Sequence, residues 1–283
     1  MRRAGAVPFA IVLGAALRVG AVIVAGGDGT QNATVPPGGR GWSRVGRIVS
    51  SNGAPSSVTY VSNNWFVTAW HIRKLDKPFA VRLEGRRYEI EPASWTRLTN
   101  PDGSGADLAL FRVAGPVRTP GVALVARPPG RGGLAILIGN GRNRAPEKTH
   151  WQADVSKKPP VWTEAGPAGN AAGYKWAPGA KKRWGMGFVA GGIRALNDGH
   201  GVTDVFYTRF VDRLGSAQGA TYDSGGGAFV IRDGAWKLAG VMLTVSGLPG
   251  QPKDTAVFGN RTYCADLSAY RTQIERIVKG EKP

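Results

Sequence analysis

The chain has 283 residues, of which 42% are hydrophobic, and a formal net charge of +18 at neutral pH. This length suits one large domain or two small ones, and the hydrophobic content argues against a disordered chain. The excess of positive charge favours anionic partners or surfaces, but charge alone does not establish nucleic-acid binding. The single cysteine, Cys264, excludes an internal disulfide, and we expect it to be a buried structural residue.

Residues 1–21 have the pattern of a signal peptide. Arg2 and Arg3 form a basic start, an apolar stretch follows over 8–17, and Val19-Gly20-Ala21 supplies small residues for a cleavage site. We therefore predict export to the cell envelope or beyond, with no membrane span once the leader is removed. The alternative is an uncleaved anchor, although the apolar stretch is short for a spanning helix.

Residues 22–42 are rich in Gly, Pro, Thr and Asn and are predicted to form an extended lead. From residue 43 onward, short apolar runs alternate with turn signals, and together with 42 Gly and 19 Pro this pattern indicates an all-β fold. The first half, 43–127, is predicted to form a small antiparallel barrel. Its strands are expected at 45–49, 57–61, 65–71, 79–83 and 87–90, with a hairpin turn at Glu84-Gly85.

A stretch rich in proline and glycine, 128–133, predicts a crossover to a second barrel over 134–264. A closing amphipathic helix is predicted over 266–279, because its apolar residues recur at helical spacing. Asp266 can cap the start of this helix, and Gly280 can end it. Strands of the second barrel are expected at 134–138, 188–192, 203–208, 228–231 and 236–243.

Ser224 lies in Tyr222-Asp223-Ser224-Gly225-Gly226-Gly227, directly before the apolar run 228–231. Glycines have no Cβ, so they allow a sharp backbone turn and leave the serine hydroxyl uncrowded. A serine on a tight bend at the mouth of a strand is well placed to act as a nucleophile. A flexible glycine loop between two strands is the alternative interpretation of this stretch taken alone.

A serine hydroxyl needs a base to become nucleophilic, and the chain has three histidines. His71 ends the apolar strand predicted over 65–71. His200 lies in a glycine turn and His150 in a basic segment, so we expect both to be surface residues. His71 is therefore the predicted base.

The base in turn needs an acid to orient it, and two aspartates compete for this role. Asp107 opens the apolar run 106–113, where a strand would hold its side chain firmly. Asp102 lies in the turn Pro101-Asp102-Gly103, where aspartate commonly bonds to the nearby backbone. We therefore prefer Asp107.

In chain order, the segments around His71, Asp107 and Ser224 resemble the three motifs of trypsin-like serine peptidases, which have the chymotrypsin fold. The resemblance covers residues 43–279 and is closest to exported bacterial members that lack disulfides. It implies two antiparallel six-stranded Greek-key β-barrels with a C-terminal α-helix, and it implies no cofactor. In this family the serine attacks an acyl carbon, the histidine transfers the proton, and the aspartate holds the imidazole tautomer.

The resemblance also implies an oxyanion hole formed by the backbone N–H groups of Tyr222 and Ser224. Tyr222 stands where glycine is usual, and tyrosine tolerates the backbone conformation expected there less well. The specificity pocket is implied at Gln218, six residues before the serine, and along one wall at Leu243, Thr244 and Val245. Because Gln218 replaces the acid that selects Lys or Arg, we expect a preference for uncharged side chains.

Some members of this family are activated when a newly freed N-terminus pairs with the aspartate before the serine, which here is Asp223. Cleavage after Ala21 would expose Val22-Ile23-Val24-Ala25-Gly26-Gly27, which resembles such a terminus. The spacing from Val22 to His71 is longer than usual for the family.

Residues 142–184 are the part of the chain least like the family. They hold nine Lys or Arg residues and five Trp or Tyr residues. This insert is either a binding face for an anionic or sugar polymer, or a long ordered loop whose aromatic residues pack on the second barrel. The chain has no phosphate-loop motif, zinc-binding histidine pair or cysteine cluster, so neither a nucleotide nor a metal is expected.

The resemblance favours an exported, monomeric serine endopeptidase that acts on proteins or peptides. The alternative is a catalytically impaired relative that binds an anionic polymer or surface. An esterase would share the chemistry and is the third hypothesis.

Overall fold

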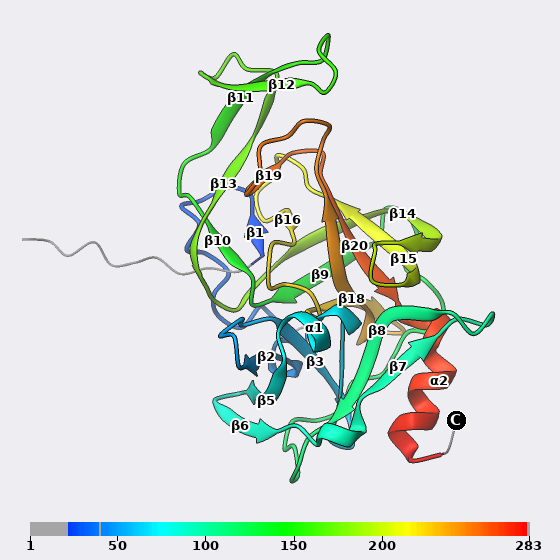
Figure 1. Cartoon of the computed structure of the whole chain (residues 1–283). Helices are drawn as coiled ribbons and strands as arrows, with labels where there is room; N and C mark the ends of the chain where they lie inside the picture. Colours follow the sequence, from blue (N-terminus) through cyan, green and yellow to red (C-terminus); the bar gives the residue numbers. More distant parts are fainter. Residues whose placement is uncertain (1–21, 40, 282–283) are drawn as a thin grey trace, which may run out of the picture.

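The chain folds into two β-sheet halves, with the N-terminal half in the lower part of Figure 1 and the C-terminal half above it. The structure is a computed structural model that describes residues 22–39 and 41–281. The expected leader, 1–21, therefore lies outside the described residues. Strands pair antiparallel in both halves. The all-β fold expected from the short apolar runs and the resemblance is therefore confirmed.

The first half is one seven-stranded sheet in the order β6-β5-β2-β3-β4-β8-β7. This sheet has one strand more than the six that the resemblance implies. Within the described residues its edge strands β6 and β7 do not pair with each other, so the sheet is a half-barrel rather than a closed barrel. The expected hairpin turn joins β5 to β6, with positive φ angles at Glu84 and Gly85. The strands are β2 (Val45–Ser50), β3 (Ser57–Ser62), β4 (Trp65–Thr68), β5 (Pro78–Leu83), β6 (Arg86–Glu89), β7 (Thr96–Thr99) and β8 (Gly105–Arg112).

The second half is a closed six-stranded barrel in the order β14-β15-β20-β18-β17-β9, as expected. Cys264 is fully buried in it. Its strands are β9 (Leu134–Gly139), β14 (Arg183–Asn197), β15 (Val202–Arg209), β17 (Gly227–Arg232), β18 (Ala235–Ser246) and β20 (Arg261–Asp266).

The chain ends in helix α2 (Leu267–Lys279), which joins the two halves through a shared core. The Asp266 side chain accepts a hydrogen bond from the Ser268 N–H, and left-handed Gly280 ends the helix, so both caps are as predicted. Short helices complete the described chain: α1 (Trp70–Leu75), η1 (Trp42–Arg44) and η2 (Pro92–Ser94). Neither described α-helix is long and apolar enough to cross a membrane.

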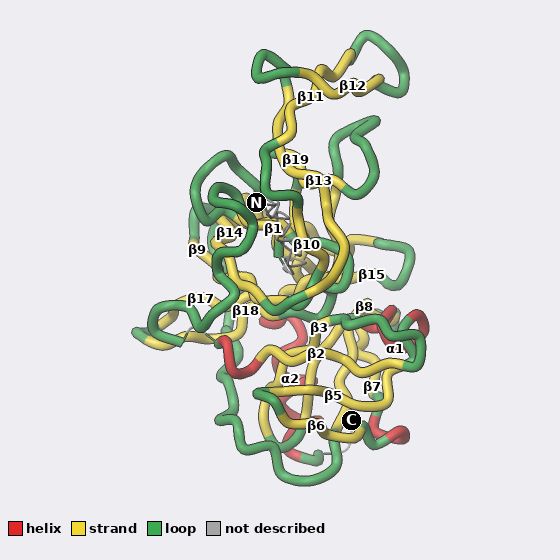
Figure 2. Tube along the Cα trace, turned by 90° about the vertical axis from the view of Figure 1, so that its left-hand side faces the viewer, coloured by secondary structure: helices red, strands yellow, loops and turns green. Residues whose placement is uncertain are grey.

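Two segments differ from a simple double barrel. Residues 22–25 are buried in the second half, where β1 (Ile23–Val24) pairs with β16 (Ala217–Gln218). The insert forms a separate sheet, which β19 from outside the insert joins, and its β11–β12 hairpin stands away from the barrel in Figures 1 and 2. The strands of this sheet are β10 (Arg142–Arg144), β11 (Thr149–Asp154), β12 (Val161–Ala165), β13 (Ala171–Ala180) and β19 (Thr255–Val257).

Candidate active site

Ser224 lies on the turn between β16 and β17, where the second half meets the first. Gly225 has a φ of +84°, and a Cβ there would lie 2.1 Å from Thr68 Oγ1 and 2.2 Å from the Ser57 carbonyl oxygen. Only glycine allows this close approach. The Gly225 N–H donates to the Met242 carbonyl at 2.8 Å, and Thr59 Oγ1 donates to the Gly225 carbonyl at 2.9 Å. The glycine-rich stretch is therefore a fixed turn, anchored from both halves, rather than a flexible loop.

His71 lies in helix α1 and not at the end of a strand. The prediction that strand 65–71 ends on His71 is wrong, because β4 ends at Thr68 and the chain turns at Ala69 into the helix. The turn places the imidazole beside β8, the neighbour of β4 in the sheet. The His71 side chain is 13% exposed, so it is largely covered by protein.

Asp107 on β8 is fully buried and holds His71 with both carboxylate oxygens. Its Oδ1 accepts the His71 backbone N–H at 2.8 Å, and its Oδ2 lies 2.7 Å from His71 Nδ1. Burial by itself raises the pKa of Asp107, but the hydrogen bonds and charge of His71 outweigh it and leave the pKa below its usual value. Asp107 is therefore an ionised acceptor that fixes the ring with its proton on Nδ1.

Asp102 remains in its turn, where its Oδ1 accepts from Ser104 N at 2.9 Å and Ser104 Oγ at 2.6 Å. These hydrogen bonds lower the pKa of Asp102, which is exposed to solvent. It has the local role that its turn predicts. Of the two aspartates, Asp107 is the one that contacts His71.

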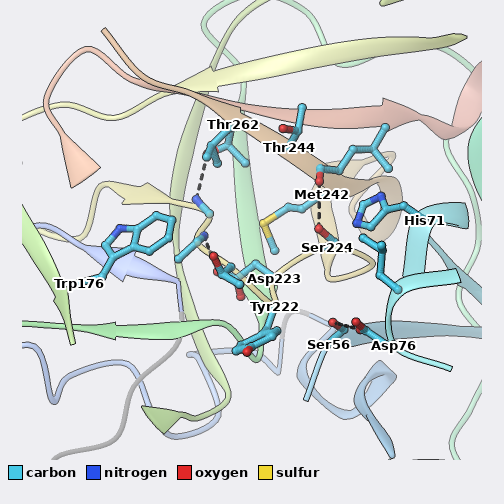
Figure 3. Close-up of a pocket in the computed structure, with 16 residues that line it drawn as sticks. Ser56, His71, Asp76, Trp176, Tyr222, Asp223, Ser224, Met242, Thr244 and Thr262 are labelled. Atoms are coloured by element: carbon cyan, nitrogen blue, oxygen red, sulfur yellow. Dashed lines mark hydrogen bonds between the residues drawn. The ribbon is translucent and has the colours of Figure 1, made fainter. Parts of the chain in front are cut away.

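Ser224 and His71 line the same cavity, which has a volume of about 270 Å³ (Figure 3). The serine hydroxyl donates to the Leu243 carbonyl on β18 at 2.9 Å. In Figure 3 the imidazole lies beside the serine, and the hydroxyl's bond runs to the carbonyl rather than to the ring. Among the described residues, no hydrogen bond joins the Ser224 hydroxyl to His71 in this arrangement.

Tyr222 adopts a φ of +77°, which is the left-handed conformation that glycine tolerates best. Its carbonyl accepts two hydrogen bonds from Ser57, from the backbone N–H and from Oγ, both at 2.9 Å. These bonds offset a backbone strain of about 1–3 kcal/mol. Within residues 41–281, the N–H groups of Tyr222 and Ser224 donate to no protein acceptor, and both residues line the cavity.

The cavity walls include three of the four residues expected to form the specificity pocket, Leu243, Thr244 and Val245. Gln218, expected on the floor, is buried in β16 and does not line the cavity, although Gly219 beside it does. Thr262 and Met242 also line the cavity, and the Gly219 N–H donates to Thr262 Oγ1 at 2.9 Å. Apolar and hydroxyl groups thus make up most of this wall.

His200 packs on the His71 imidazole, a contact that the sequence did not indicate. The ring centroids of His71 and His200 are 4.8 Å apart and the rings are tilted by 36°. Arg97 holds the loop in place by donating to the His200 carbonyl at 2.6 Å. Asp198 in the same loop has a raised pKa because of its burial and the nearby charge of Asp107. In the sequence this turn reads only as Asp198-Gly199-His200. No local pattern there indicates that the turn packs against His71.

Asp223 is buried behind the serine and is held by backbone donors. It accepts hydrogen bonds from Gly141 N at 2.7 Å and Ala220 N at 2.8 Å, and the Val22 N–H is a third donor. Burial nevertheless raises the pKa of Asp223 to about 7. No cationic side chain contacts it among the described residues. The segment beginning at Val22 therefore reaches the aspartate that the resemblance assigns to a freed N-terminus.

Several charged side chains of the insert have partners within the protein or are buried. Lys148 pairs with Asp212, Lys175 with Glu164 and Lys182 with Glu84. Arg144 and Arg183 are buried, and so are the aromatic rings of Trp151 and Tyr174. This arrangement favours the ordered, packed insert over the polymer-binding face.

His150 lies on β11 within this insert. Among the described residues, no cluster of His, Cys, Asp or Glu could hold a metal ion.

Comparison with known proteins shows which solved structures share the fold of this chain. No protein-family model matches the chain, and no curated protein matches its sequence. A solved structure of Rv3671c from M. tuberculosis H37Rv, a serine-to-alanine mutant in an inactive form, is 15% identical with a TM-score of 0.53, and the match covers 93% of this chain and 99% of that one. A second structure, Rv3671c protease in its inactive form, is 14% identical with a TM-score of 0.52, covering 90% and 99%. At this identity the likeness establishes the fold alone, and that fold matches the double barrel of chymotrypsin-like proteases.

Proposed function

We propose that the protein is an exported serine endopeptidase with Ser224 as nucleophile, His71 as general base and acid, and Asp107 as the orienting acid. The observation that carries this proposal is the Asp107–His71 pair beside Ser224 in one cavity. The chymotrypsin-like fold supports the same reading. Export rests on the signal-peptide pattern of residues 1–21.

In this mechanism Ser224 Oγ rotates away from the Leu243 carbonyl and attacks the substrate carbonyl carbon, while His71 Nε2 takes its proton. Asp107 stabilises the imidazolium that forms. The N–H groups of Tyr222 and Ser224 donate to the developing oxyanion. The tetrahedral intermediate expels the amine, which receives the proton from His71. Water then attacks the acyl-enzyme by the same route and releases the acid.

A fluorophosphonate probe should label folded and processed protein at Ser224. Ser224→Ala should abolish labelling, because it removes the hydroxyl that the proposal assigns as the nucleophile. Ser56→Ala is the matched control, since Ser56 lines the same cavity but hydrogen-bonds to Asp76. Peptide mapping of the labelled protein measures the site. An unlabelled wild-type protein would support the catalytically impaired alternative, and labelling that persists in Ser224→Ala would refute the assignment of the nucleophile.

Cleavage should follow uncharged side chains of modest size. The wall formed by Gly219, Met242 and Thr262 offers no carboxylate to a Lys or Arg side chain, and such a cation would lose a charge-assisted hydrogen bond. We expect kcat/KM for Lys or Arg before the scissile bond to be about ten- to a hundredfold below that for a small apolar residue. A positional peptide library measures this preference. A profile dominated by Arg and Lys would refute this preference and would show that a carboxylate lining the cavity elsewhere, Asp76 or Asp223, serves the substrate cation.

A further inference from the structure

Arg144 lies at the base of the insert, and all three nitrogens of its guanidinium group donate hydrogen bonds to backbone carbonyls. It is 7% exposed. Its Nε donates to Val24 O at 2.9 Å, and its Nη2 donates to Gly26 O and, at 3.0 Å, to Gly27 O. Its Nη1 closes the insert on itself by donating to Ala145 O at 2.7 Å and Pro146 O at 2.8 Å. One buried side chain thus ties β10 to the segment 22–27.

Tyr174 on β13 supports the same segment from another strand of the insert. Its ring lies under the Arg144 guanidinium, whose central carbon is 3.9 Å from the ring centroid. Its hydroxyl accepts the Gly26 N–H at 2.9 Å. Because Tyr174 is itself 2% exposed, the ring and the guanidinium form a dry, stacked pair. Together the two side chains satisfy backbone groups on both sides of Gly26.

The far end of this segment touches the turn that carries the nucleophile. β1 pairs with β16, and the Val22 N–H donates to Asp223. Asp223 also accepts from Gly141, which directly precedes β10. A Cβ on Gly141 would lie 2.4 Å from Asp223 Oδ2, so the carboxylate sits in a cradle that fits only glycine. A continuous set of contacts therefore runs from Arg144 through 22–27 to Asp223 and Ser224.

We propose that Arg144 and Tyr174 are positioning residues for the proposed peptidase reaction, and that the insert exists to hold segment 22–27 against the turn of Ser224. This assignment rests on the proposed function for its kinetic consequence. It gives Arg144 a role in shaping the oxyanion hole, in place of binding an external polymer. Arg144 touches neither substrate nor the reacting atoms in this scheme.

The first test compares Arg144→Met with Arg144→Lys and with Lys157→Met. Lys157 is an exposed cation of the same insert, so its variant is the matched control for loss of charge. Arg144→Met should lower kcat and the rate of probe labelling about ten- to a hundredfold, approaching the loss of an oxyanion donor, with a smaller change in KM. Arg144→Lys should recover part of this loss, and Lys157→Met should match the wild type. Equal activity in Arg144→Met and the wild type would overturn the proposal.

A double-mutant cycle with Asp223→Asn separates positioning from a general loss of stability. If Arg144 acts through Asp223, adding Arg144→Met to Asp223→Asn should change kcat by less than about twofold, because the connection is already broken. Losses that multiply would show that Arg144 only stabilises the fold. Should Asp223→Asn fail to fold, Tyr174→Phe, which removes only the acceptor for the Gly26 N–H, takes its place as the second change.

Hydrogen exchange supplies a readout that needs no activity. In Arg144→Met, exchange should accelerate at the amides of Ala25 and Gly26 and also at Gly141 and Gly225, while strands of the first half keep their protection. Faster exchange confined to Ala25 and Gly26 would overturn the positioning role. If exchange spreads to Gly225 but the wild type is never labelled by the probe, the proposed function fails and the structural coupling stands.

Discussion

Replacing His71 with alanine should lower kcat/KM for a peptide substrate by about 10⁴- to 10⁶-fold, the range found when a triad member is removed from such enzymes. Without the imidazole, Ser224 has no base within reach, and the proton of its hydroxyl cannot leave as the bond to carbon forms. Substrate binding in the cavity should change little, so the loss should fall on kcat. Steady-state kinetics with a short peptide measures both constants.

His150→Ala and His200→Ala are the controls for this result. His150 lies in the insert and should have no effect. The His200 ring packs against the His71 ring at a tilt and does not line the cavity with Ser224, so its loss should cost less than about tenfold through a less well held imidazole. Equal losses from all three variants would contradict the assignment of the base.

A chain that begins at Val22 should be more stable at pH 8 than a chain extended by even one residue before it. In the extended chain the Val22 nitrogen is an amide, and buried Asp223 keeps a pKa of about 7. The same carboxyl titrates near pH 3.9 when unfolded, so between about pH 4 and 7 the unfolded state releases its proton first. Folding stability then falls as pH rises, by roughly 4 kcal/mol in total.

A freed Val22 ammonium group would reverse this effect, because it supplies the counter-charge that buried Asp223 lacks. The ionised carboxyl would then be favoured, and stability would be kept up to the pH at which the ammonium loses its proton. An α-amino group has a pKa of about 8 in water, and pairing raises it, so the advantage should disappear as pH rises above that range.

Thermal unfolding of the two chains from pH 4 to pH 10 measures this prediction. The difference in Tm should be small at pH 4 and largest near pH 8. Asp223→Asn in both chains is the control and should remove the difference, since an amide does not titrate. Identical pH profiles for the two chains would exclude a pairing of the freed Val22 terminus with Asp223.

Local patterns in the sequence were sufficient for the elements that local physics controls. The apolar runs punctuated by glycine and proline predicted a β fold, because strand and turn preferences act over a few residues. Asp266 and Gly280 predicted both ends of α2, because caps are formed by adjacent backbone groups. The glycines after Ser224 predicted a sharp turn for the same reason.

Contacts between distant segments were beyond these patterns. The sequence favoured Asp107 over Asp102 because of its expected strand, but only the pairing of β4 with β8 shows how Asp107 comes to His71. It placed His71 in a strand, because Trp, His and Ile at 70–72 favour strands as readily as a short helix. His200 reaches His71 across 129 residues of chain, and Arg144 reaches Gly26 across 118. Such contacts depend on how the two halves and the insert pack, and no local preference encodes them.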